Sequence, residues 1–133
     1  MSQMPSLTGI PSGAAVLAAV CDVMEVAIAD MPGKTTPRTR PRLQWARNMA
    51  AFVMHDLGIS DGAIAKSFGG IHRITIIVRR RRMAEKLECT QRYRDHHMAI
   101  LSHLAASQSR NHYDSIRAES SSHSLAASSL SSV

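Results

Sequence analysis

Apolar residues recur at intervals of three and four along two stretches of the sequence, and this spacing restricts the fold more than any other feature. A repeat close to 3.6 residues predicts amphipathic α-helices. Aromatic residues make up only 4% of the 133 residues and apolar residues 44%, so the core must consist of aliphatic side chains and methionine. We therefore expect an all-α protein. The repeating positions are Val16, Leu17, Val20, Val23 and Met24 in the stretch Ala14–Glu25, and Ala46, Met49, Ala50, Val53 and Leu57 in the stretch Leu43–Leu57.

Glycine and serine mark where further helices begin and end. Gly33 closes a short apolar turn, and Gly58 ends the second of the long stretches. Ser60 is a suitable N-cap for the short helix that follows it. The additional helices expected are Asp61–Phe68, His72–Leu87 and Gln91–Leu104.

Composition divides the chain into five segments. The last of them contains 11 serines in 27 residues, so it buries too little apolar surface to offset its ordering entropy, and we expect it to be disordered. The first contains two prolines and a glycine and is expected to be a flexible arm. The segments are the arm 1–12, an N-terminal helix and turn 13–33, a basic proline-containing linker 34–42, a compact helical domain 43–106 and the serine-rich tail 107–133.

Positive charge is concentrated in the middle of the chain. Residues 34–94 hold 14 Lys and Arg against 4 Asp and Glu, a net charge of +10, whereas the whole chain carries +6. The remaining residues therefore carry −4. A concentrated basic segment suits a polyanion, and nucleic acid is the commonest one. Charge alone would equally suit a solvated basic surface.

A glycine pair, Gly69-Gly70, separates two of the expected helices. Two helices joined by a tight glycine turn are typical of the helix-turn-helix, whose second helix places its first residues at base edges in the major groove. Arg73 could donate to guanine N7 and O6, and Thr75 could contact a base or a phosphate. The alternative is a helical hairpin that binds nothing. The residues at the start of the second helix are Ile71, His72, Arg73, Ile74 and Thr75.

Four consecutive arginines follow in the same helix. At about 100° per residue they sweep roughly 300° of its surface, so they cannot all contact one phosphate strand. We expect at least one to lie near the packing face, where it must reach outward or pair with an acid. The candidate phosphate contacts are Arg79, Arg80, Arg81 and Arg82, together with Arg42 and Lys66.

The segment IAKSFGGIHRITII resembles the helix-turn-helix of the C-terminal DNA-binding domain of DnaA, the bacterial chromosomal replication initiator. ARNMAAFVMHDL and AVCDVMEVAIADMPGK are similar to the family's preceding helices, and the resemblance covers about residues 15–105. It implies a compact helical domain of the DnaA domain IV or Trp-repressor-like type. It also implies that Arg47 enters the minor groove and that Thr75 keeps the second hydroxyl of the family's signature.

The chain departs from the family at the start of the second helix. Ile71, His72, Arg73 and Ile74 stand where the family has arginine, aspartate, histidine and serine or threonine. Phosphate contacts position a protein and base contacts specify its site, so we expect DNA binding to survive and site preference to change. The 133 residues leave no room for the family's ATPase module, so we expect a stand-alone DNA-binding protein.

Other classes of function are disfavoured. Cys89, His96, His97 and His103 lack the spacing of a tetrahedral zinc site. Asp95 beside His96 could suggest acid–base chemistry, but no nucleophile or oxyanion motif accompanies the pair, so we expect no metal, cofactor or enzymatic activity. Residues 13–31 contain three acidic residues and are too charged to span a membrane. Two cysteines without a CxxC motif and the lack of a basic signal-peptide start predict a cytoplasmic location.

The sequence thus predicts a nucleoid-associated protein that binds specific double-stranded DNA and regulates replication initiation or transcription. About 6 phosphates would be neutralised by Arg38, Arg40, Arg42, Arg47, Lys66 and part of the run Arg79–Arg82. The alternative is a protein-interaction module in which the apolar helix Ala14–Glu25 binds a partner or a second copy and the basic surface is incidental.

Overall fold

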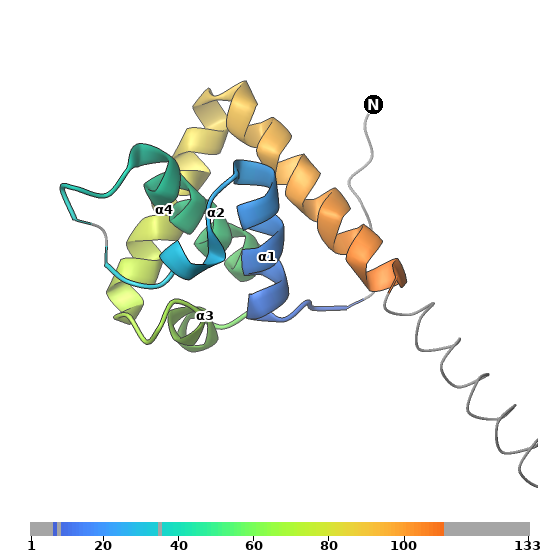
Figure 1. Ribbon diagram of the computed structural model, residues 1–133, viewed down its shortest axis with the longest axis horizontal. Helices are drawn as coiled ribbons and strands as arrows, with labels where there is room; N and C mark the ends of the chain where they lie inside the picture. Colours follow the sequence, from blue (N-terminus) through green and yellow to red (C-terminus); the bar gives the residue numbers. More distant parts are fainter. Residues whose placement is uncertain (1–6, 8, 35, 111–133) are drawn as a thin grey trace, which may run out of the picture.

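The regular secondary structure of the described residues consists of helices (Figure 1). The computed structural model describes residues 7, 9–34 and 36–110, and within these ranges the chain has no β-strand. The all-α prediction is therefore confirmed. The elements are α1 Gly13–Met24, the 3-10 turn η1 Ile28–Asp30, α2 Pro41–Asp56, α3 Asp61–Ser67 and α4 Arg73–Cys89, followed by a helix over residues 91–110 that we call helix 91–110.

Local sequence signals explain where these helices begin and end. The Ser12 hydroxyl accepts a hydrogen bond from the Ala15 amide at the start of α1, and Ser60 does the same for Ala63 in α3. Gly58, at φ 95°, follows the end of α2 in a conformation that glycine adopts at little cost. The predicted helix boundaries agree with the structure to within about two residues from α1 to α4.

One core joins α1, α2, α3, α4 and helix 91–110. It is aliphatic and rich in methionine, with Phe68 as its one fully buried aromatic side chain among the described residues. Burying a side chain of this size contributes about 1.5–3 kcal/mol of transfer free energy, so these contacts fix how the helices pack. The largest fully buried side chains are Phe68, Met31, Met49, Met54, Ile64, Ile76, Met83, Ile100, Leu104, Val16, Val20 and Val53.

The apolar face of α1 lies inside this core. Val16 and Val20 are fully buried, and α1 packs against α2 and α3. The sequence-based alternative used this face to bind a partner or a second copy. In the folded protein the face is already covered, so that surface is not available for such contacts.

Helix 91–110 lies across α1 and extends away from the body of the protein (Figure 1). Ile100 and Leu104 anchor it in the core, and the His103 ring lies 2.7 Å from an Asp22 carboxylate oxygen. The helix continues four residues beyond Ala106, where the sequence predicted the disordered tail to begin. The rest of that tail, residues 111–133, lies outside the described residues.

The predicted N-terminal arm also lies partly outside the described residues, at 1–6 and 8. Of the remainder, Pro11 is buried and Leu7 packs half-buried against the core. Ser12 is the N-cap of α1, so the arm contacts the helical body at Leu7, Pro11 and Ser12. No helix in the part of the chain that the structure describes is long and apolar enough to cross a membrane.

Candidate nucleic-acid interface

The turn between α3 and α4 depends on its two glycines. Gly69 and Gly70 have φ values of 86° and 84°, which a residue with a Cβ atom adopts only with strain. A Cβ atom on Gly69 would also lie 3.4 Å from Pro32. The Gly70 amide donates to the Ala65 carbonyl at 2.9 Å and closes the end of α3. The sharp break predicted at this pair is confirmed, and it sets α4 against α3.

His72 caps the start of α4. Its Nδ1 accepts a hydrogen bond from the Ile74 amide at 3.1 Å. Arg73 and Ile74 in the first turn are exposed, and Thr75 is half-buried. Ile71 packs partly against the core instead of facing outward. The surface at the start of α4 is therefore formed by His72, Arg73 and Ile74, all of which are exposed.

Four exposed side chains follow one another at helical spacing along α4. Ile74, Val78, Arg81 and Arg82 stand at positions i, i+4, i+7 and i+8, and we call this surface the outer face of α4. Ile76, Arg79 and Met83 lie on the opposite, buried face. Val78 was not among the predicted site residues, although its spacing from Ile74 could have indicated it.

Arg79 is the arginine of the run that faces inward, and it is only 3% exposed. Its Nη2 donates to the Gly33 carbonyl at 2.8 Å, and its guanidinium lies 4.9 Å from the centre of the Phe68 ring. The sequence predicted that an inward arginine would reach solvent or pair with an acid, and Arg79 does neither. Burial, and to a lesser degree the charge of Arg47, lowers the pKa of Arg79 to about 10. The side chain is therefore still charged at neutral pH, but it cannot contact DNA.

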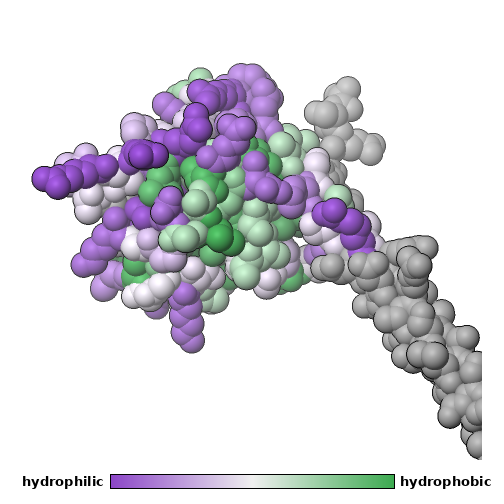
Figure 2. All heavy atoms as spheres, in the orientation of Figure 1, coloured by the Kyte–Doolittle hydropathy of each residue, from purple (hydrophilic) through white to green (hydrophobic). Residues whose placement is uncertain are grey.

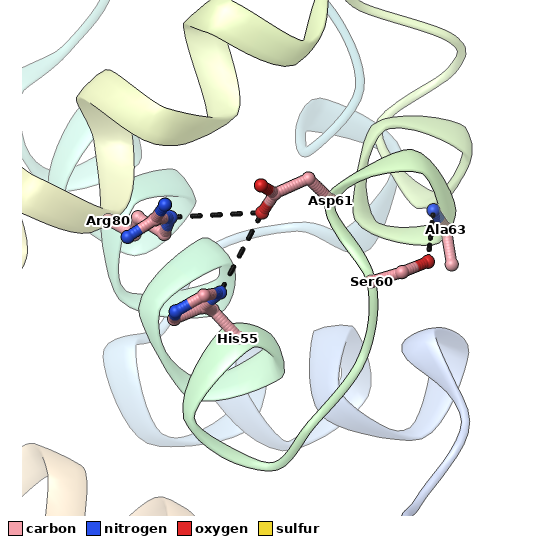
Figure 3. A network of polar contacts seen from close by, with 5 residues as sticks. All are labelled: His55, Ser60, Asp61, Ala63 and Arg80. Atoms are coloured by element: carbon pink, nitrogen blue, oxygen red, sulfur yellow. Dashed lines mark hydrogen bonds and ion pairs between the residues drawn. The ribbon is translucent and has the colours of Figure 1, made fainter.

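Arg80 is tied to α3 by an ion pair (Figure 3). Its Nε lies 3.7 Å from Oδ1 of Asp61, and Nδ1 of His55 lies 3.7 Å from the same oxygen. These contacts link the end of α2, the start of α3 and the middle of α4. Because Asp61 balances the charge of Arg80, the outward positive charge of the run comes from Arg81 and Arg82.

Arg47 is not on the surface where the resemblance places it. It lies in the middle of α2 and is 6% exposed. Its Nε donates to the Met31 carbonyl at 3.1 Å, and its Nη2 donates to the carbonyls of Asp30 and Pro32 at 2.8 and 3.0 Å. Its Nη1 donates to Lys34 O at 3.2 Å. The minor-groove role implied for Arg47 is therefore corrected to a structural one: it holds the loop of residues 30–34.

The other predicted phosphate contacts divide between two sites. Lys66 is exposed in the last turn of α3, next to the glycine turn. Arg42 lies at the start of α2, 3.9 Å from Glu25, and lines a cavity of about 270 Å³ with Trp45 and Tyr93. Figure 2 shows hydrophilic side chains on the side of the molecule where, in Figure 1, the loop before α2 and the start of α4 lie.

Comparison of the sequence with models of known protein families and with curated proteins gives no significant match. The arguments about function therefore rest on the residues and their geometry.

Proposed function

We propose that this protein binds double-stranded DNA through α3, the glycine turn and α4, with the first turns of α4 in the major groove. The observation that carries the proposal is the outer face of α4, where two apolar and two arginine side chains project from a helix whose other side is held by the core. A rigid helix with exposed basic residues that follows a shorter helix and a tight turn suits the major groove.

Electrostatics support the same surface. Lys66, Arg73, Arg81 and Arg82 are all exposed on α3 and α4, whereas Asp61, on α3, is engaged with Arg80. Lys66, Arg81 and Arg82 would contact the phosphate backbone and release its counterions, and Arg73 at the start of α4 would reach a base edge. The inward positions of Arg47 and Arg79 reduce the basic contact set that the sequence predicted, but they leave these four in place.

The finer proposal is a DnaA-like helix-turn-helix that acts without ATP hydrolysis, as a regulator of replication initiation or of transcription. It rests on the resemblance of residues 64–77 and 46–57 to the family. Direct readout differs from the family because Ile74 replaces a hydroxyl and Arg73 replaces a histidine. We propose that the protein occupies a site of its own and not the family's box.

Selection of bound duplexes from a random pool tests this proposal. The selected duplex should then be compared with a scrambled one at fixed salt, using wild type, Arg73→Ala and the control Arg92→Ala. Arg92 is an exposed arginine on helix 91–110. Loss of a bidentate base contact costs about 1–3 kcal/mol of discrimination, so Arg73→Ala should reduce the preference by about 5- to 150-fold. Arg92→Ala should leave it unchanged. Failure of the folded protein to bind any duplex would refute the proposal.

A further inference from the structure

Two large apolar side chains lie exposed one turn apart on the outer face of α4. Ile74 is 63% exposed and Val78 is 39% exposed, and they are two of only four large hydrophobic side chains so exposed in the described residues. Exposed single apolar residues are common, but an adjacent pair at the start of a helix beside a basic turn marks a contact surface. Neither side chain is needed for the core.

Charge indicates what covers this pair. Arg73 precedes Ile74, and Arg81 and Arg82 follow Val78 within one turn, all of them exposed. A second copy of the chain packed face to face would bring these arginines against their own counterparts. A polyanion balances them. Glu85 stands four residues beyond Arg81 on the same face, which confines the anionic contact to the first turns of the helix.

The chemistry of the major groove indicates which group of the DNA Ile74 and Val78 contact. Base edges there present hydrogen-bond donors and acceptors, and the C5-methyl of thymine is the apolar group they display. Isoleucine and valine can make no hydrogen bond to a base edge. Placed at the bases, they would leave polar edges unsatisfied everywhere except beside a methyl group.

We infer that Ile74 and Val78 read the C5-methyl groups of thymines in the major groove, so that the protein selects duplexes by methyl contact at these positions. The inference rests on the proposed DNA-binding function. Four residues advance α4 by about 6 Å, close to two base steps of about 3.4 Å each. The two side chains therefore reach methyls about two base pairs apart.

Replacement of thymine by deoxyuridine tests the inference, because it removes only the methyl and leaves base pairing intact. Each thymine of a selected duplex is replaced singly, and affinity is measured for wild type, for Ile74→Ala/Val78→Ala and for the control Ile28→Ala. Ile28 is 54% exposed and lies on η1. We expect about fourfold weaker binding for each contacted methyl in wild type and in Ile28→Ala, and no such loss in the double variant.

The outcomes separate this inference from the function on which it rests. Equal affinity for thymine and deoxyuridine duplexes in wild type would overturn methyl readout and leave DNA binding intact. A complete lack of duplex binding would refute both. If the double variant lost self-association in sedimentation while the deoxyuridine ratio stayed at one, the pair would be a contact between copies and the inference would be wrong. Because both side chains are exposed, circular dichroism should show the double variant folded as wild type.

Discussion

Arg79 donates a hydrogen bond of 2.8 Å to the carbonyl oxygen of Gly33, a residue 46 positions earlier in the chain. This contact joins the buried side of α4 to the loop that follows η1. The same loop is held from α2 by Arg47. Two arginines in a strongly basic chain thus hold one loop against the core, whereas Lys66, Arg73, Arg81 and Arg82 remain exposed.

Arg79 is predicted to matter for folding and not for DNA affinity. Arg79→Ala should lower the free energy of unfolding by about 2–4 kcal/mol, because it leaves a cavity over Phe68 and removes the donor to Gly33. Arg79→Met fills much of the cavity and should cost less. Urea unfolding measures both. A folded Arg79→Met protein with weakened duplex binding would contradict the inward role.

Replacement of Arg47 by methionine should lower the free energy of unfolding more than the same replacement of Arg79. Arg47→Met leaves the carbonyls of residues 30, 31, 32 and 34 without their donor, and we expect a loss of about 2–4 kcal/mol of stability. Arg47→Lys should recover little of it, since an ammonium cannot reproduce the fork of donors. Chemical denaturation of the two variants checks this. The opposite pattern, with full stability and weakened DNA binding, would restore the minor-groove role.

Stability should fall on acidification because of His97. Burial lowers the pKa of this imidazole, and the carboxylate of Asp56 opposes the shift. The ring packs edge-on against Phe52, with centroids 5.4 Å apart. The unfolded chain then binds a proton more readily than the native state below about pH 6.5, so this contribution is present above that pH and is lost as the pH falls.

Urea midpoints at pH 7.5 and 5.5 test the role of His97. His97→Leu should lose less stability between the two values than wild type does. Asp56→Asn should lose more, because it removes the charge that favours the imidazolium. Identical losses in wild type and His97→Leu would show that other groups control the acid response.

Much of the fold follows from local signals. Ser60, Gly58 and the glycine pair Gly69-Gly70 each act on their own neighbours, so the sequence predicts where α2, α3 and α4 begin and end. The predicted helix Gln91–Leu104 ends six residues too early, because the prediction relied on the serine-rich composition that follows and not on packing against the core. Leu104 anchors the last predicted turn in the core, and the helix continues from it.

The roles of individual arginines could not be predicted in this way. Helical geometry required one member of the run to face inward, but only the positions of Phe68 and Gly33 identify it as Arg79. Arg47 finds its acceptors 13 to 17 residues away, in a loop whose path depends on the whole fold. The resemblance assigned Arg47 a role from the residues next to it in the sequence. Its role in the structure depends instead on the four backbone carbonyls to which it donates.

The salt dependence of duplex binding tests the central proposal most directly. Lys66, Arg81 and Arg82 should contact about three phosphates, so log K against log salt should fall with a slope of about −2.7. This is shallower than the slope near −5 that the larger basic set predicted from the sequence implies. Arg81→Ala/Arg82→Ala should reduce the slope by about two, and Arg92→Ala should leave it unchanged. A slope near zero, or one that the double substitution does not alter, would contradict DNA binding through the outer face of α4.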